Sequence, residues 1–249
     1  MEIKRKPFQG LINIIIFNFH YYLVFIVGMV LLMFLFQHYP GYRSLWYGGL
    51  CAGTALMLNS FFVSYLVYDR SSLYQLTWLD QLNISKPAVL VNLHAGLDEI
   101  SGLLKLKFPL SELIVCDFYN PLVNTEWSIK IARKKAVKFP NTLIVKTASL
   151  PLENKSADLV VLFLSVHEIR SSPERENFFF ELERILKYSG KIVVVEHLRD
   201  IPNFFAFNIG FFHFYPRQCW IKTFYDTGFA ITAEIKITPF IHVFELQKS

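Results

Sequence analysis

The chain has 249 residues, of which 53% are hydrophobic and 16% aromatic, and its mean hydropathy is +0.35. This composition is too apolar for an ordinary soluble domain and too charged for a chain wholly embedded in a membrane. The formal net charge of +5 is modest. In a membrane-attached protein such a charge favours contact with anionic lipid headgroups over nucleic-acid binding, so membrane lipids are expected partners and nucleic acid is not.

Two stretches near the N-terminus, residues 12–36 and 45–68, contain no Asp, Glu, Lys or Arg. Each is long enough to cross a bilayer as a helix, and Pro40 and Gly41 break the chain between them. A cleaved secretory signal is disfavoured because the first stretch is too long and no small-residue cleavage pattern follows. Two buried helices of a soluble bundle remain the alternative. The sequence predicts a transmembrane helical hairpin that anchors the protein through residues 1–72.

Positive charges flank the predicted hairpin unequally. Three basic residues at 4–6 precede the first helix and Arg70 follows the second, whereas the turn contains only Arg43. The positive-inside rule therefore places both ends of the hairpin in the cytoplasm. We expect a two-pass protein of the cytoplasmic (inner) membrane, with residues 73–249 in the cytosol.

Residues 73–249 alternate between strand-like and helical patterns. The strand-like runs are PAVLVNL, ELIVCD, NTLIVK, ADLVVLFL and KIVVVEH. The helical patterns are EISGLLKLK, NTEWSIKIARKKAVK and PERENFFFELERILK. This order predicts an α/β domain of Rossmann-like type, in which helices cover both faces of a doubly wound, mostly parallel sheet. FAITAEIKI and FIHVFELQK then predict an antiparallel hairpin at the C-terminus.

The passages LVNLHAGLDEIS, LIVCDFYNP, ASLPLENKSADLVVLFL and ELERILKYSGKIVVVEHLRD together resemble class I S-adenosylmethionine-dependent methyltransferases. The likeness runs from about Pro87 to the C-terminus. It is closest to small-molecule enzymes of the quinone-biosynthesis type, and more narrowly to membrane-anchored relatives of these. The resemblance implies S-adenosylmethionine as the cofactor, and in its last passage a helix that ends at Gly190 before a buried strand.

The resemblance places a cofactor loop after the first strand, where the family has Asp-Leu-Gly-x-Gly-x-Gly. Asn92 stands in place of the acidic residue, His94 in place of the first glycine, and Asp98 in place of the third. Gly96 alone keeps the family's residue. Close approach of the backbone to the cofactor requires such a turn, and a single glycine can supply it if its neighbours tolerate their backbone angles.

A second set of cofactor ligands is implied downstream. Asp117 ends the second strand, where a carboxylate accepts hydrogen bonds from ribose hydroxyls, and Phe118 is a candidate to pack on the adenine. Asp117 alternatively only caps the following turn. The family's adenine-side carboxylate is missing before Leu150, so Ser149 and Leu150 are expected to contact adenine through backbone groups.

The acceptor side of the site is expected beyond the carboxyl ends of the fourth and fifth strands. His167 and Glu168, which follow the fourth strand, are the candidate catalytic residues, because a histidine titrates near neutrality. The alternative is that His167 only caps the strand or bonds to the Arg170 loop. The His and Glu residues show no metal-ligand spacing in the sequence, so no metal is predicted.

A phenylalanine-rich segment, IPNFFAFNIGFFHFYPRQCW, follows the fifth strand, where the family builds its acceptor lid. Phe205, Phe211 and His213 are its candidate lid residues. A lid of this composition beside a membrane anchor indicates a small amphiphilic or aromatic acceptor, lipid-soluble and drawn from the bilayer. Ordinary core packing of one helix is the alternative.

The predicted function is therefore methyl transfer from S-adenosylmethionine to oxygen or carbon of a lipid-soluble or aromatic small molecule. A catalytically silent methyltransferase fold, used as an interaction module at the membrane, is the alternative that His94, Asp98 and the missing carboxylate favour. A nicotinamide-dependent reductase is disfavoured because the first loop lacks Gly-x-Gly-x-x-Gly and no Tyr-x-x-x-Lys pair follows the fourth strand.

Overall fold

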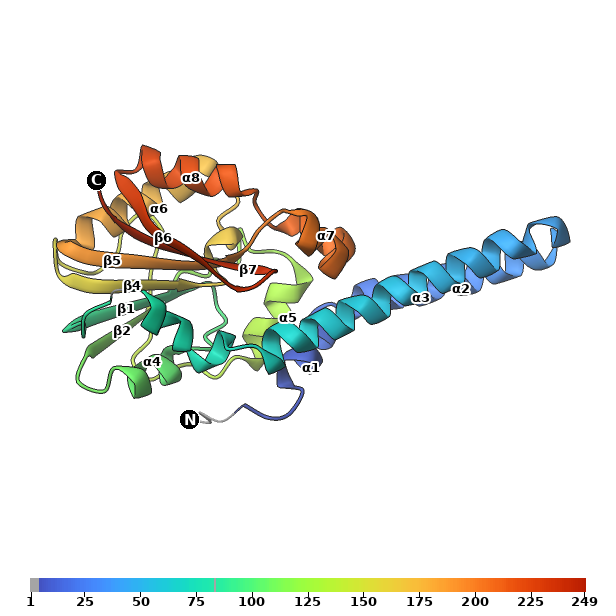
Figure 1. Cartoon of the computed structure of the whole chain (residues 1–249), viewed down its shortest axis with the longest axis horizontal. Helices are drawn as coiled ribbons and strands as arrows, with labels where there is room; N and C mark the ends of the chain where they lie inside the picture. Colours follow the sequence, from blue (N-terminus) through green and yellow to red (C-terminus); the bar gives the residue numbers. More distant parts are fainter. Residues whose placement is uncertain (1–4, 83) are drawn as a thin grey trace.

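A computed structural model describes residues 5–82 and 84–249, so Lys4, one of the basic residues invoked for topology, lies outside the described residues. Figure 1 shows a long helical hairpin that projects from an α/β body. Helix α2 (Phe19–Gln37) and helix α3 (Arg43–Tyr65) form the hairpin, and the short 3-10 turn η1 (Pro40–Tyr42) joins them. Both helices are long and apolar enough to cross a membrane, and none of the apolar window in α2 is buried.

The first apolar stretch forms two helices rather than one. Helix α1 (Gln9–Phe17) ends at Asn18, whose side chain donates a hydrogen bond to the carbonyl of Ile14 at 3.0 Å. This local bond competes with the helical backbone pattern, as asparagine side chains commonly do. The chain therefore changes direction at Asn18, and only the 19 residues of α2 continue into the hairpin. At 1.5 Å per residue, α2 spans about 28 Å, close to the hydrocarbon thickness of a bilayer.

Helix α1 packs against the segment that follows α3, at the base of the hairpin. The backbone N–H of Gly10 and that of the next residue each donate to the carboxylate of Asp69 at 2.8 Å. These are first-turn N–H groups that lack partners within the helix. A Cβ on Gly10 would lie 2.3 Å from Cβ of Tyr68, so only glycine permits this close approach. The start of α1 is thus joined to the segment that leads from the hairpin into the body.

The body contains one seven-stranded sheet. Its strands are β1 (Val89–His94), β2 (Glu112–Asp117), β3 (Leu143–Ile144), β4 (Ala157–Phe163), β5 (Leu186–His197), β6 (Phe229–Thr238) and β7 (Ile241–Lys248). Its longer helices are α4 (Ser101–Lys107), α5 (Trp127–Lys135), α6 (Ser172–Ile185), α7 (Ile201–Phe207) and α8 (Arg217–Asp226). Short helical turns are η2 (Leu66–Arg70), η3 (Leu73–Gln75), η4 (Thr77–Gln81), η5 (Val166–Glu168) and η6 (Asn208–His213).

The strand order across the sheet is β3-β2-β1-β4-β5-β7-β6. Strands β1 to β5 pair in parallel, and β7 pairs antiparallel with both β5 and β6. The predicted Rossmann-like α/β fold with a C-terminal antiparallel hairpin is confirmed. Chain order reverses between β1 and β4, and in open sheets of this kind ligands bind beyond the carboxyl ends of the strands at such a reversal.

The predicted helix stop at Gly190 is wrong. Helix α6 ends at Ile185, and β5 begins at the next residue, so Gly190 lies inside the strand. The pairing of β4 with β5 shifts register between Ala157 and Leu159, and a Cβ on Gly190 would lie 3.0 Å from the carbonyl oxygen of Ala157. Glycine therefore accommodates a bulge between two strands here.

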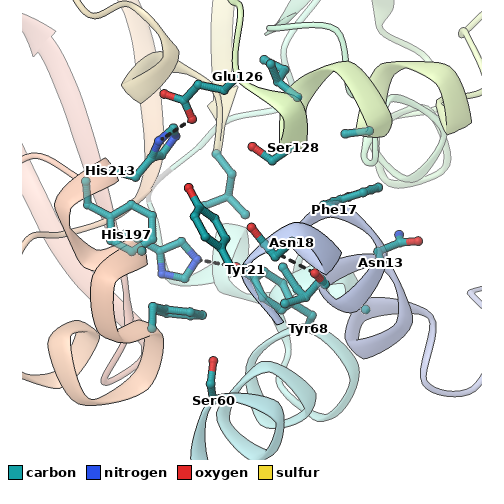
Figure 2. A pocket seen from close by; sticks show the side chains of 18 of the residues that line it. Asn13, Phe17, Asn18, Tyr21, Ser60, Tyr68, Glu126, Ser128, His197 and His213 are labelled. Atoms are coloured by element: carbon teal, nitrogen blue, oxygen red, sulfur yellow. Dashed lines mark hydrogen bonds and ion pairs between the residues drawn. The ribbon is translucent and has the colours of Figure 1, made fainter. Parts of the chain in front are cut away.

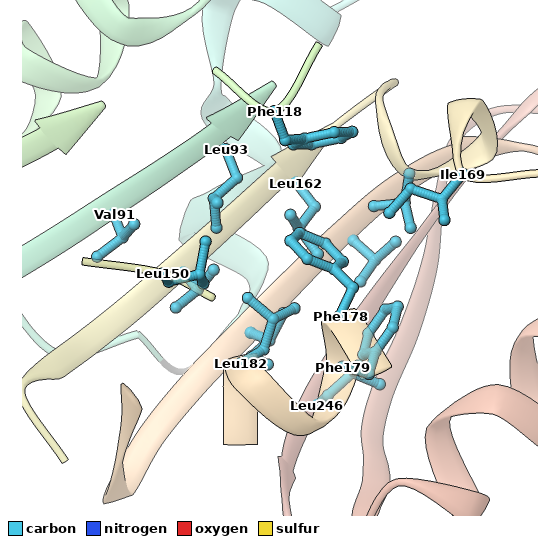
Figure 3. Packing of buried hydrophobic residues seen from close by; sticks show 14 of the residues in the cluster. Val91, Leu93, Phe118, Leu150, Leu162, Ile169, Phe178, Phe179, Leu182 and Leu246 are labelled. Atoms are coloured by element: carbon cyan, nitrogen blue, oxygen red, sulfur yellow. The ribbon is translucent and has the colours of Figure 1, made fainter. Parts of the chain in front are cut away.

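Hydrophobic side chains cover both faces of the sheet, which explains why the central strands are apolar without alternation. On one face Val91, Val160 and Val194 join a cluster with residues of α6 and α8. Figure 3 shows part of this cluster, with Phe178 and Phe179 of α6 over the strands. On the other face, alternate residues such as Leu90, Val161 and Val195 pack against η4, α4, α7 and the end of α3. The hairpin thus enters the core of the body.

Candidate functional site

A cavity of about 500 Å³ lies between the body and the N-terminal helices. Its inner wall comes from the carboxyl ends of the strands, with Ala95 and Leu97 after β1 and Phe163 at the end of β4. Its outer wall comes from α1, the start of α2 and the second half of α3. Figure 2 shows Tyr21 projecting from these helices toward His197 and His213. The cavity thus crosses the boundary between hairpin and body.

His167 and Glu168 reach this cavity because the chain turns sharply after β4. Leu164 has a φ of 47°, a left-handed conformation that costs a non-glycine residue about 1 kcal/mol. The turn leads into η5, which carries both residues. Nε2 of His167 lies 3.5 Å from Oε1 of Glu168. A backbone angle of this kind is typical of functional sites, where the surrounding structure maintains it.

Glu196 supports His167 from beneath. It is the penultimate residue of β5 and has no exposed surface, and its Oε2 lies 2.6 Å from Nδ1 of His167. Its Oε1 accepts hydrogen bonds from the backbone N–H of Val166 and of His167. Burial disfavours charge on His167, but the carboxylates of Glu196 and Glu168 outweigh it and raise the pKa of His167 to about 10. Burial also opposes charge on Glu168, yet hydrogen bonds from His167 and His213 hold the pKa of Glu168 well below its ordinary value.

His213 joins this pair from the η6 segment. Its Nε2 lies 3.3 Å from Oε1 of Glu168, and the rings of His167 and His213 have centroids 5.0 Å apart. Its Nδ1 lies 3.1 Å from Oε2 of Glu126, and this hydrogen bond holds the pKa of Glu126 below its ordinary value. Arg170 contacts the His213 ring and also donates to the His213 carbonyl at 2.7 Å. The fold therefore brings together His167, Glu168 and His213.

The remaining predicted lid residues lie outside the cavity wall. Phe205 is 58% exposed on α7, where its carbonyl accepts a 2.6 Å hydrogen bond from the Asn59 side chain of α3. Phe211 packs against the ring of Phe204. The same segment lines the cavity instead through His213 and the neighbouring rings of Phe207 and Phe214. These last two rings enclose His197 at centroid distances of 5.0 and 4.8 Å.

His197 connects the sheet to the hairpin. Its Nδ1 lies 2.9 Å from the carbonyl oxygen of Phe240, which can only accept, so Nδ1 carries the proton. Its Nε2 then accepts the hydroxyl of Tyr68 at 2.8 Å. Burial lowers the pKa of His197 to about 4, so the ring is neutral at physiological pH.

The predicted cofactor loop places three residues at the end of β1. Asn92 is 1% exposed and donates to the hydroxyl of Ser101 at 2.7 Å, while its own Oδ1 has no partner among the described residues. His94 accepts the backbone N–H of Gly96 through Nδ1, and its buried Nε2 likewise has no partner in the part of the chain described. Burial lowers the pKa of His94. Gly96 has a φ of 89°, which only glycine adopts without strain.

Asp117 lies beside this loop and is held by Arg133. Nη1 of Arg133 is 2.6 Å from Oδ2 of Asp117, and the backbone N–H of Tyr119 donates to Oδ1 at 3.0 Å. The guanidinium also stacks over the Tyr119 ring, 4.3 Å from its centroid. A Cβ on Gly96 would meet the Arg133 side chain at 2.8 Å. Arg133 therefore fills the space between the loop and the carboxylate.

The other predicted cofactor residues lie apart from this pair. Phe118 is 4% exposed and packs in the core against Phe178, at a centroid distance of 5.3 Å (Figure 3). Ser149 is exposed, and Leu150 is buried with its backbone N–H donating to Glu181 at 2.9 Å. The backbone N–H of Leu150, which was expected to contact adenine, is therefore already bonded to Glu181 of α6, which Arg184 also contacts at 2.8 Å.

Sequence reasoning missed several residues of the site. Glu126 and Tyr119 belong to it, as do polar residues such as Asn18 and Ser60 of the N-terminal helical region, which line the cavity. Asn18 and Ser60 carried a usable signal, because asparagine and serine are unusual in an otherwise apolar spanning segment and often mark a functional face. Glu126 carried none, since its partner His213 lies far away in the chain.

Comparisons with known proteins agree with the observed fold. Residues 98–194 match a family model described as a methyltransferase domain. A solved protein of Pyrococcus horikoshii OT3 shares 16% identity over 72% of this chain and 89% of its own, with a TM-score of 0.52. A SAM-dependent methyltransferase from Methanosarcina mazei shares 14% identity over 68% and 96%, with a TM-score of 0.50. No match is found among curated proteins.

Geranyl diphosphate C-methyltransferase from Streptomyces coelicolor A3(2), solved with Mg²⁺, geranyl diphosphate and S-adenosyl-L-homocysteine, is also similar. It shares 11% identity over 69% of this chain and 76% of its own, with a TM-score of 0.50. At these identities the solved structures establish a common fold, and the domain match adds the type of chemistry.

The residues at the ends of β1 and β2 fit S-adenosylmethionine, the cofactor of this fold. Asn92 and His94 offer buried polar atoms without partners among the described residues, and Asp117 offers a carboxylate for ribose hydroxyls. Gly96 leaves its backbone open to close approach. The fit requires one movement, because the end of the Arg133 side chain must leave Asp117. A flexible side chain can make that movement without a change in the backbone.

Proposed function

We propose that this chain, an S-adenosylmethionine-dependent methyltransferase with the class I fold, methylates a lipid-soluble acceptor that enters its cavity along the N-terminal helices. The observation that carries this proposal is the shared cavity. Helices that are apolar enough to cross a membrane form one of its walls, and His167, Glu168 and His213 lie on the other.

The lining of the cavity supports an amphiphilic acceptor. Phe25, Leu56 and Met57 give its hairpin side an apolar surface, whereas the histidines and Glu168 place polar atoms at the inner end. A ligand with an apolar tail and a polar or aromatic head matches this distribution. The tail would lie against the hairpin, and the head would lie between the polar cluster and the loop of Gly96.

Methyl transfer requires the protein mainly to position the two reactants. When bound, S-adenosylmethionine supplies an electrophilic methyl group on a sulfonium ion. The chain must hold an acceptor oxygen or carbon in line with that group and keep water away. Glu168 and His213 line the cavity, where they would contact the polar head of the acceptor. We assign His167 to a positioning role, because Glu196 fixes its ring.

The test is transfer of a radiolabelled methyl group from S-adenosylmethionine into extracts of the cells that produce the chain. The full-length protein, in lipid nanodiscs, is supplied separately with the organic extract and with the aqueous extract of those cells. We expect label in the organic extract, in a compound that chromatography then identifies. Label confined to the aqueous extract would contradict a lipid-soluble acceptor.

Two neighbouring residues of α3 provide matched variants. Met57 lines the cavity, while Leu58 is 57% exposed on another side of the helix. Met57→Trp makes the cavity narrower at its apolar wall. We therefore expect the rate of methyl transfer to the organic acceptor to fall about tenfold, equivalent to about 1.4 kcal/mol. Leu58→Trp should leave the rate unchanged. Equal rates in both variants would show that the acceptor does not use this wall.

The proposed location is the cytoplasmic membrane, crossed twice, with the N-terminus and body in the cytosol. Support comes from α2 and α3 and from the position of the basic residues at the base of the hairpin. Tyr39 lies exposed in the turn and Ser249 at the other end of the molecule. We expect a membrane-impermeant maleimide to label Tyr39→Cys on intact cells and to leave Ser249→Cys and the wild type unlabelled. Labelling of Ser249→Cys alone would reverse the topology.

A further inference from the structure

Two imidazoles and one carboxylate converge at the inner end of the cavity. Nε2 of His167 and Nε2 of His213 face the same oxygen, Oε1 of Glu168, at 3.5 and 3.3 Å. Ligand atoms from these three residues all lie within 4.8 Å of one another. They come from η5 and η6, and all three residues line the cavity. Glu168 and His213 lie far apart in the sequence, so no motif spacing could have indicated the cluster.

Each imidazole is also held from behind by a carboxylate. Nδ1 of His167 lies 2.6 Å from Glu196, and Nδ1 of His213 lies 3.1 Å from Glu126. Histidines that bind metals commonly donate Nδ1–H to a carboxylate in this way. In His167 this bond fixes the tautomer, so that Nε2 presents its lone pair to the ion. In His213, Nη2 of Arg170 also lies 2.9 Å from Nε2, so the guanidinium must withdraw from the ring before the ion can bind. Glu196 is itself fixed by two backbone N–H groups and has no exposed surface.

The charges around the cluster leave room for a divalent cation. Glu126, Glu168 and Glu196 contribute three negative charges, and the guanidinium of Arg170, which donates to Glu126 at 3.1 Å, contributes one positive charge. Imidazoles that bind a metal are neutral, and with both of them neutral the net charge of these groups is −2. One divalent ion would neutralise the site, and Glu168 and Glu196, whose side chains are 12% and 0% exposed, require compensation of that kind.

We propose that His167, Glu168 and His213 bind a divalent transition-metal ion, with Glu196 and Glu126 as outer carboxylates. Two imidazole nitrogens suit zinc, iron, manganese or cobalt, whereas magnesium and calcium prefer sites built of oxygen. Three protein ligands leave open coordination positions, as catalytic sites require. These positions face the cavity, so on the proposed function they would hold an oxygen of the acceptor's polar head.

Metal content of the full-length protein tests the site without reference to activity. The chain is purified without a histidine tag and without chelators, and its metals are measured by mass spectrometry. We expect about one transition-metal ion per chain. Metal-free protein is then titrated with Co²⁺, whose visible absorption reports nitrogen and oxygen ligands. A wild-type protein that neither retains metal nor changes the Co²⁺ spectrum would overturn the proposal.

Four variants separate this site from adventitious binding. His213→Ala and Glu168→Gln each remove a ligand, so both should lose the metal and the Co²⁺ spectrum while circular dichroism shows an intact fold. His38→Ala, an exposed histidine in the hairpin turn, should behave as wild type. Glu196→Gln keeps all three ligands but weakens one outer carboxylate, and Co²⁺ should bind about tenfold to a hundredfold more weakly. Full metal content in His213→Ala and Glu168→Gln would place the ion elsewhere.

Methyl transfer is measured separately, so the two proposals can fail independently. If the protein binds metal through these residues but methylates only aqueous compounds, the metal-site proposal stands and the proposal of a lipid-soluble acceptor fails. If the protein methylates the organic extract equally well with and without metal, the acceptor proposal stands and the ion does not bind the acceptor.

Discussion

Nη1 of Arg133 lies 2.6 Å from Oδ2 of Asp117, the carboxylate that is expected to bind the ribose of the cofactor. On that expectation the guanidinium would compete with the ribose hydroxyls for Asp117. Arg133→Ala removes the competitor and leaves Oδ2 of a buried carboxylate open to the cofactor, while the backbone N–H of Tyr119 still donates to Oδ1. We therefore expect S-adenosylmethionine to bind about tenfold more tightly to Arg133→Ala, equivalent to about 1.4 kcal/mol, in calorimetric titrations of the detergent-solubilised protein.

Lys134→Ala is the matched control, because this neighbouring basic residue of α5 is exposed. Its cofactor affinity should equal that of the wild type, and Asp117→Ala should bind no cofactor. Weaker binding in Arg133→Ala would show that the guanidinium contacts the cofactor instead of competing with it. Absence of binding in wild type and Arg133→Ala alike would favour the silent interaction module.

Some residues of the site can be found from sequence because they end apolar strands. Asp117, His167 and Glu168 all follow buried runs, and the topology of a parallel sheet brings such positions to one edge. The partners of these residues cannot be found in that way. Arg133 reaches Asp117, and Glu196 reaches His167, across distances in the chain that only tertiary packing sets.

Among whole elements, the sequence predicts interiors better than ends. The strand pattern ELIVCD gives the bounds of β2, because polar turns follow the apolar run on each side. The helical pattern PERENFFFELERILK overruns α6 by two residues, because Leu186 and Lys187 favour a helix by composition whereas the pairing of Leu186 with Ala157 begins β5. The break at Asn18 was missed because residues 12–36 contain no Asp, Glu, Lys, Arg or Pro. In these places tertiary contacts override local preference.

The contact of α1 with η2 depends on one glycine. A methyl group on Gly10 would meet Tyr68 at 2.3 Å, so Gly10→Ala must push α1 away from Asp69 and from the cavity. We expect Gly10→Ala to destabilise the protein by about 1–3 kcal/mol, measured by denaturant unfolding in detergent. Proteolysis of α1 should become faster in parallel.

Gly28→Ala is the control, because we expect it to change the stability of the protein in the opposite direction. Gly28 lies within α2, and a Cβ there would meet nothing within 4 Å. Alanine favours a helix over glycine, so this variant should be as stable as the wild type or more stable, by up to about 1 kcal/mol. If both variants gained stability, α1 would not pack against η2 as described.

At the scale of the whole molecule, the hairpin contributes more than attachment. The division into an anchor of residues 1–72 and a methyltransferase domain of residues 73–249 stays a prediction. Contacts nevertheless cross that boundary, with Arg5 paired to Glu99 at 3.2 Å and Tyr68 bonded to His197. Composition predicts the two parts but not the cavity between them, because no local pattern encodes how a hairpin packs on a sheet.

The hydrogen bond between Tyr68 and His197 also makes the stability of the fold depend on pH. His197 has a pKa of about 4 in the fold, against 6.5 as its ordinary value, because a charged ring would be buried and would lose Tyr68 as a donor. The unfolded chain therefore takes up a proton that the folded chain refuses. Stability is fully present above pH 6.5 and is lost as the pH falls toward about 4, by about 3 kcal/mol at most from this residue.

Glutamine at position 197 separates this effect from general acid unfolding. Its amide can serve both Tyr68 and Phe240 without titrating, so His197→Gln should unfold with a shallower dependence on pH between 6.5 and 4, and His38→Gln should follow the wild type. The same slope in all three proteins would refute the linkage. If the slope differs as expected, a mildly acidic medium would weaken the attachment of the hairpin to the sheet. The proton would then behave as a ligand that binds the unfolded chain more tightly than the folded one.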